Sequence, residues 1–147
     1  MIRLVAKALL NKGVTSAQGI RFDDARAMFD DVIERYASMA DPELQLRVAA
    51  ALVNKGVVLT QQGKIEDALA AYNTVTQRYG TSPEPALKEQ VAKALFNKAT
   101  IFARQMRLEE ANRIYDEIIA RFGSAEGPEL KEQVSRVPAE RSVSYHF

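Results

Sequence analysis

A motif that returns twice constrains the fold of this chain more than any other feature of its sequence. Residues 5–13 read VAKALLNKG, residues 48–56 read VAAALVNKG, and residues 91–99 read VAKALFNKA, with a step of 43 residues each time. The second and third copies of the whole unit agree at 17 of 43 positions, which excludes coincidence. Self-similarity at a period of about 20 to 50 residues is typical of repeat proteins. We therefore expect units at about 5–47, 48–90 and 91–133.

Each unit is predicted to contain two helices. In the second unit, apolar residues recur three or four positions apart along a first helix from about Pro42 to Gln62 and a second from about Ile65 to Tyr79. Asp41 can cap the first helix, ahead of a proline that suits the first helical position. The second helix carries acidic residues in its first turn and an arginine in its last, which matches the helix dipole. Strands would need a period of two, which these segments lack.

Glycine and proline predict where the helices end. Gly80 and Gly123 follow the second helices and are expected to stop them as glycine caps. A fourth unit begins at Pro128 but departs from the pattern at Pro138, because proline inside a helix costs about 3 kcal/mol. We therefore expect a capping helix over 128–137 and a tail over 138–147.

These elements predict an all-α fold, an α-solenoid of stacked antiparallel helix hairpins with about three units and a C-terminal capping helix. A lone hairpin cannot bury its apolar face, so neighbouring hairpins must complete the core by stacking. A length of 147 residues fits a single domain over 1–147.

The combination of residues in each unit resembles a tetratricopeptide repeat. The family pattern combines a small residue or glycine, a turn, an acidic pair, an alanine and an aromatic, and the resemblance covers residues 5–133. The matching residues are Asn11, Gly13, Phe22, Asp23, Asp24, Ala25 and Phe29 in the first unit, Asn54, Gly56, Gly63, Ile65, Glu66, Asp67, Ala68 and Tyr72 in the second, and Asn97, Ala99, Leu108, Glu109, Glu110, Ala111 and Tyr115 in the third.

Three departures from the family pattern alter the expected geometry. The usual period is about 34 residues, and the extra residues, such as 81–90, are expected to lengthen the first helix by about two turns. Lysines stand where the family usually has leucine, so either the packing around the first helix differs or the lysine stems reach to solvent. The turn glycine is replaced in the first and third units. These residues are Lys12, Lys55 and Lys98 for the lysines, and Ile20 and Met106 for the replaced glycine.

The resemblance also implies where a partner binds. In tetratricopeptide proteins the first helices line a concave groove, and the corresponding residues here are mainly apolar, which suits an amphipathic helix or an extended hydrophobic segment. The alternative is that the apolar members are core between units, and that the asparagines bond neighbouring helices instead of a bound peptide backbone. The expected groove residues are Leu10, Asn11, Val14, Ala17, Val53, Asn54, Val57, Phe96, Asn97 and Thr100.

Residues for chemistry are scarce in this sequence. Cysteine is absent and His146 is the only histidine, so neither a thiolate site nor a histidine metal site is predicted. The acidic pairs Asp23–Asp24, Glu66–Asp67 and Glu109–Glu110 recur at the start of each second helix. This recurrence indicates a dipole-stabilising role in every unit, since an active site needs one cluster. We expect no enzyme activity, no metal and no cofactor.

Charge and hydropathy narrow the kind of partner and the location. The chain has 20 lysines and arginines against 19 aspartates and glutamates, a balance that offers little to the phosphates of a nucleic acid. Its first residues lack the apolar segment of a signal peptide, and no apolar run approaches the roughly 18 residues that span a membrane. We expect a cytoplasmic protein with no nucleic-acid and no membrane partner.

The function expected from these observations is that of a scaffold module that binds another protein or peptide. The alternative is a self-associating structural module, a homodimer or larger homo-oligomer held through the ends of the solenoid. The shortened first helix and the break at Pro138 motivate this alternative, because solenoid ends need polar caps to stay soluble.

Overall fold

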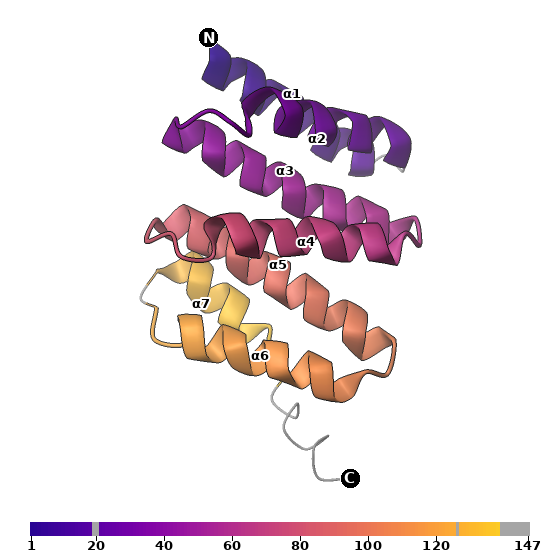
Figure 1. The fold of residues 1–147 in the computed structure, drawn as a ribbon, viewed down its shortest axis with the longest axis vertical. Helices are drawn as coiled ribbons and strands as arrows, with labels where there is room; N and C mark the ends of the chain where they lie inside the picture. Colours follow the sequence, from indigo (N-terminus) through magenta and orange to yellow (C-terminus); the bar gives the residue numbers. More distant parts are fainter. Residues whose placement is uncertain (19–20, 126, 139–147) are drawn as a thin grey trace. The chain divides into compact units, whose positions relative to one another are not determined.

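The computed structural model of the chain describes residues 1–18, 21–125 and 127–138 (Figure 1). Within these ranges it contains seven helices and no strand, in agreement with the all-α prediction. The helices are α1 (Ile2–Gln18), α2 (Phe22–Tyr36), α3 (Pro42–Gln61), α4 (Ile65–Tyr79), α5 (Pro85–Arg104), α6 (Leu108–Phe122) and α7 (Pro128–Ser135). The first helices α3 and α5 have 20 residues each, and the second helices α2, α4 and α6 have 15.

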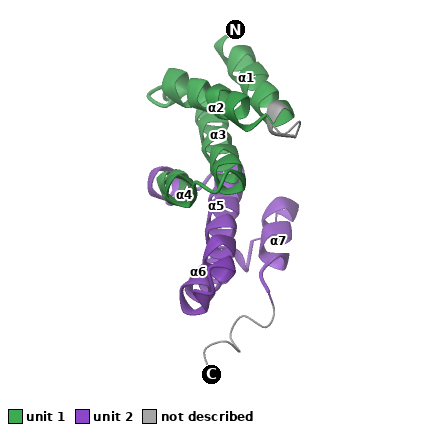
Figure 2. Cartoon of the chain, turned by 90° about the vertical axis from the view of Figure 1, so that its right-hand side faces the viewer, with its two compact units in different colours: residues 1–75 green, residues 76–147 purple. Residues whose placement is uncertain are grey.

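Two compact units make up the chain, Met1–Val75 and Thr76–Phe147, and the boundary between them falls within α4 (Figure 2). In the first unit, α1 and α2 form a helix hairpin, and α3 packs against both. In the second unit, α5 and α6 form a hairpin, and α7 packs against both. Within each unit, the hairpin therefore packs against the helix that follows it, which is the packing that the solenoid prediction expects there. The single domain over 1–147 stays a prediction.

The start of α3 shows how the sequence specifies a helix locally. The Asp41 carboxylate accepts hydrogen bonds from the backbone N–H groups of Glu43 at 2.9 Å and Leu44 at 3.1 Å. Pro42 occupies the first turn, where a missing N–H costs nothing. The cap and the proline are confirmed as predicted, and α4 has the predicted bounds, Ile65–Tyr79.

Alanine and aromatic residues of the second helices form the centre of the core. Ala25 and Phe29 of α2 are fully buried, and Tyr72 of α4 is 2% exposed. In the second unit, Ala111 and Tyr115 of α6 are buried as well. Residues four positions apart lie on the same face of a helix, so each alanine and its aromatic point into the same core. The alanine and aromatic positions of the family pattern are therefore core positions.

The glycines expected to cap the second helices do not use the left-handed backbone of a glycine cap. α4 and α6 end directly before Gly80 and Gly123, but Gly123 has φ −62° and ψ −26°, and Gly80 is not left-handed either. Among the described residues, positive φ occurs at Gly63 (77°) and Met106 (61°). The predicted stops before these glycines are therefore confirmed, and the left-handed conformation of a glycine cap is not. The left-handed residues follow the first helices, where the chain reverses into the second helix.

The left-handed residues complete the same hydrogen-bond pattern at the ends of α3 and α5. The N–H of Lys64 donates to the carbonyl of Leu59 at 2.8 Å, and the N–H of Arg107 donates to the carbonyl of Phe102 at 2.9 Å. This pattern is the Schellman motif, which satisfies carbonyls that a helix C-terminus leaves without a partner. Met106 adopts the conformation that Gly63 adopts in the second repeat because the same turn joins both hairpins.

The C-terminal cap is shorter than expected. The predicted capping helix over 128–137 is observed as α7, which ends at Ser135 and packs against α5 and α6. Its buried residues are Leu130 and Gln133. The tail from residue 139 onward, with His146, lies outside the described residues, as does Ile20.

Candidate functional site

The face expected to bind a partner lies, in the first unit, on the neighbouring helices α1 and α3. Asn11 of α1 is exposed, and Val14 of α1 and Asn54 and Val57 of α3 are half-buried. These two helices pack against each other, so the structure brings the four residues onto adjacent helices. Each valine lies three positions after an asparagine, which places the polar and the apolar group side by side on the helix surface.

Three other expected members add little to this surface. Leu10 is 6% exposed and Val53 is 5% exposed, so both side chains are buried. The side chain of Ala17 lies outside the described ones. The accessible part of the face in this unit is therefore made by the asparagines and the valines.

The asparagine side chains keep their hydrogen-bonding capacity. Asn11, Asn54 and Asn97 make no side-chain hydrogen bond to any other residue of the described ranges. Each amide carries two N–H donors and one carbonyl acceptor. No hydrogen bond thus supports the interpretation in which the asparagines tie neighbouring helices together. Their donors and acceptors are open to a bound group.

In the second unit, part of the expected face is covered. Phe96, Asn97 and Thr100 of α5 are half-buried, and the Thr100 hydroxyl donates to the carbonyl of Phe96 at 3.0 Å. The Phe96 ring lies 6.1 Å from the Tyr115 ring. The guanidinium carbon of Arg136, directly after α7, lies 4.3 Å from the Phe96 centroid. This cation–π contact occupies the ring that a partner would otherwise touch.

The role of Arg136 was not predicted from the sequence. Its guanidinium Nη1 donates to Oε1 of Gln133 at 3.1 Å, and Gln133 is 4% exposed. This bond holds the cation at the end of α7. The signal that could have found it is the repeat itself, because Arg136 lies 43 residues after the basic Lys93 of α5.

One of the repeat lysines shows why leucine is not needed at its position. The Nζ atom of Lys55 on α3 lies 2.6 Å from Oδ1 of Asp30 on α2, and the lysine side chain is 29% exposed. Its stem runs along the helix surface while its amine pairs with an acid of the preceding helix. Lys12, at the same repeat position of α1, is exposed.

In α2 and α6, acidic residues of the first turn form ion pairs with nearby arginines. Oδ2 of Asp24 lies 2.8 Å from Nη2 of Arg21, and Oε2 of Glu110 lies 2.5 Å from Nη2 of Arg107. The hydrogen bond from Arg107 lowers the pKa of Glu110. No group of residues suited to hold a metal ion occurs in the part of the chain that the structure describes.

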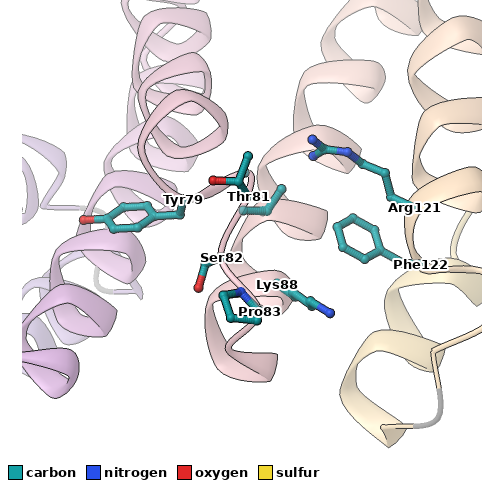
Figure 3. A pocket seen from close by; sticks show the side chains of 9 residues that line it. Tyr79, Thr81, Ser82, Pro83, Lys88, Arg121 and Phe122 are labelled. Carbon is teal, nitrogen blue, oxygen red and sulfur yellow. The ribbon is translucent and has the colours of Figure 1, made fainter.

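Each unit also has a shallow hollow. The hollow of the first unit, about 280 Å³, lies between α2, α3 and α4 and is lined by Arg26, Lys55 and Asp67 among smaller residues. The hollow of the second unit, about 340 Å³, contains Lys88 and Arg121 (Figure 3). In that view the Tyr79 hydroxyl points away from both cations.

Comparison with known proteins identifies one family. A family model described as tetratricopeptide repeat matches residues 5–83. Neither the curated proteins nor the solved structures gave a match to the chain. No helix in the described ranges is long and apolar enough to cross a membrane.

Proposed function

The chain belongs to the tetratricopeptide repeat family, and on that premise we propose that it binds a peptide or a helix of a partner protein through the exposed face of its first helices. Repeats of this family are generally protein–protein interaction modules without catalytic groups of their own. Solenoids of stacked hairpins present extended surfaces for such partners. The face formed by Asn11, Val14, Asn54 and Val57 is the part of the first unit that we assign to binding.

The observation that carries this proposal is the pair of unengaged amides on adjacent helices. Packed helices lie about 8–10 Å apart, and three residues of extended chain span about 10 Å. An extended peptide that crosses α1 and α3 would therefore present a backbone amide to Asn11 and, three residues further, another to Asn54. The two asparagines can each donate to a peptide carbonyl and accept from a peptide N–H.

The valines next to the asparagines set the chemistry of the partner. Val14 and Val57 are half-buried and offer apolar surface beside each amide. A partner that fills such a surface needs apolar side chains on one side, spaced as in an amphipathic helix or on alternate residues of an extended segment. Apolar contact supplies affinity here, and the amides set the register of the bound backbone.

The experiment that tests this proposal begins with a peptide library displayed on phage and selected on the full chain. The affinity of the selected peptides is then measured by fluorescence anisotropy. We expect Val57→Arg to weaken binding at least about tenfold, since it places a charge where an apolar side chain docks, and to leave the circular dichroism spectrum unchanged. The matched control is Leu108→Arg, which adds the same charge at an exposed apolar residue of α6.

A second pair of variants separates the amides from the valines. Asn54→Asp keeps the shape of the side chain but removes both N–H donors, so it should weaken binding of the same peptides by about five- to tenfold. Asn73→Asp, on α4, changes the net charge equally and should bind as the parent does. Equal affinity of the Val57→Arg variant and the parent would show that the partner binds elsewhere.

A further inference from the structure

One face of α1 is exposed although the same residues are buried in α3. Val5 is 41% exposed, whereas Val48, at the same repeat position of α3, is completely buried. Ala8 of α1 is likewise exposed, and its counterpart Ala51 is completely buried. The local sequences are nearly identical, so the difference lies in what covers them. In the described structure α1 packs only against α2 and α3.

The face of α3 that corresponds to this surface shows what such a face is built to bind. It packs against α2, an amphipathic helix with acidic residues on its outer side. The contact includes the ion pair between Lys55 and Asp30 at 2.6 Å. It also includes hydrogen bonds from Gln62, which follows α3, to Asp23 at 3.0 Å and from Arg26 to Gln62 at 3.3 Å. Apolar contact is thus flanked by an ion pair in which the first helix supplies the cation, Lys55, and the second helix the acid, Asp30.

The exposed face of α1 carries the same cation without the acid, because Lys12 stands at the repeat position of Lys55. α1 contains Arg3, Lys7 and Lys12 and no acidic residue. Arg3 is engaged by Asp41, with its Nη2 atom 2.6 Å from Oδ2, so its charge is used within the unit. Lys12 lies seven positions after Val5 and four after Ala8, so it stands on the same face of the helix. Its side chain is exposed and makes no ion pair with the described residues. An apolar strip bordered by uncompensated positive charge favours an acidic partner.

We propose that this face of α1 is a second docking site, which takes an amphipathic helix of a partner protein that carries a carboxylate opposite Lys12. The partner helix has the character of α2, with an apolar stripe for Val5 and Ala8 and an acid in the place that Asp30 takes toward Lys55. Charge argues against a second copy of α1 as the occupant, since each such face carries Lys12 and neither supplies an acid to pair with it. The site is distinct from the face of Asn54 and Val57.

The test uses the full chain with a copy of residues 21–36 attached ahead of Met1 through a flexible glycine–serine linker of about ten residues. Such a linker spans roughly 17 Å on average and holds the attached helix at millimolar effective concentration. We expect the thermal midpoint to rise by about 3–5 °C above that of a chain with a scrambled copy. Val5→Asp in α1 should abolish the rise, because it puts a charge into the apolar contact.

Exchanging two charges tests for the ion pair between Lys12 and Asp30 of the attached copy. Lys12→Asp should remove part of the rise, and Asp30→Lys in the attached copy should restore it, because opposite charges then face each other again. Val57→Arg should leave the rise in the thermal midpoint unchanged. The test of this docking site and the test of the peptide-binding face can therefore fail independently. A midpoint equal to that of the scrambled control would overturn the proposal. Sedimentation of the unmodified chain as a dimer that Val5→Asp dissociates would also overturn it, because a second copy would then be the occupant.

Discussion

The aromatic ring of Tyr72 lies against the backbone of Gly56: a Cβ atom built on that glycine would stand 2.4 Å from Cε1 of the ring. The same relationship joins Gly13 and Phe29 in the first hairpin, at 2.6 Å. Neither glycine is left-handed. Each is needed because the second helix sends a large aromatic directly onto the first helix, where only a hydrogen atom fits.

We therefore predict that Gly56→Ala destabilises the fold by about 1–3 kcal/mol, because the added methyl group must displace a buried ring. The measurement is the free energy of unfolding in guanidinium chloride. In the third repeat the equivalent pair is Ala99 and Tyr115, which indicates that an alanine is tolerated once the ring has moved. The loss of stability in Gly56→Ala should therefore lie near the lower end of this range.

Two further variants separate crowding from backbone strain. Tyr72→Leu should recover part of the loss in the Gly56→Ala background, because the smaller side chain gives room for the methyl group. Gly63→Ala should also destabilise, by about 1–2 kcal/mol, because its φ of 77° disfavours a Cβ. Nothing lies within 4 Å of a Cβ there, so Tyr72→Leu should not relieve that loss. Equal relief of both variants would contradict the steric explanation for Gly56.

Met106 is predicted to be a site where glycine stabilises the protein. Its φ of 61° costs a non-glycine residue about 1–2 kcal/mol, and its side chain is 75% exposed, so little packing is lost on removal. We expect Met106→Gly to raise the unfolding free energy by about 0.5–1 kcal/mol. The control is Met106→Ala, which keeps the strained backbone and should give no gain. Thermal unfolding followed by circular dichroism distinguishes the two.

The pH dependence of stability should contain a contribution from Asp41. The hydrogen bond from Arg3 lowers the pKa of the Asp41 carboxyl below its ordinary value of 3.8. A carboxyl whose pKa is lower in the folded state stabilises the protein above the unfolded value and loses that effect as the pH falls through the folded value. The stability difference between the parent and Asp41→Asn should therefore shrink as the pH is lowered below 3.8.

Salt provides the control for the Asp41 prediction. Arg3 and Asp41 lie at the surface, so 1 M sodium chloride should screen their attraction and reduce the difference at neutral pH. Asparagine is itself a good helix cap, so the Asp41→Asn variant isolates the charge from the cap. A difference that stays constant between pH 2 and pH 6 would contradict the assignment.

Asn112 is predicted to be a destabilising polar residue in the core of the second unit. It is 3% exposed, and its Nδ2 atom is buried with no hydrogen-bond partner among the residues that the structure describes. A buried donor without a partner costs about 1–3 kcal/mol. We expect Asn112→Leu to raise the unfolding free energy by about 1–2 kcal/mol, since the equivalent residue of the second repeat, Leu69, is a leucine. Asn97→Leu, at a half-buried position, should change it by less than about 0.5 kcal/mol.

Local sequence determined the helices of this protein. The cap at Asp41, Pro42 in the first turn and the bounds of α4 follow from residues within one or two turns of each other, and their physical causes act at that range. The spacing of Ala68 and Tyr72 likewise identified a core face before any neighbour was known. The backbone conformation of the residue that follows each second helix was not predicted, because several conformations can follow a helix that stops before glycine.

The candidate site could be predicted only in part. The repeat placed Asn11, Asn54, Val14 and Val57 on equivalent surfaces, but it did not show that Leu10 and Val53 are buried. It also did not show that Arg136 covers Phe96. Both facts depend on which helix packs against which face, and residues distant in the sequence decide that.

Val5 and Val48 show most clearly which properties the sequence determines and which the tertiary structure decides. They stand at the same place in nearly identical segments, and the sequence by itself determined that both lie on an amphipathic helix with lysine seven positions later. The tertiary structure decided that Val48 is fully buried and Val5 is 41% exposed, because α2 packs on that face of α3 and no described helix packs on that face of α1. Periodicity is a property of the segment, whereas burial is a property of its neighbours.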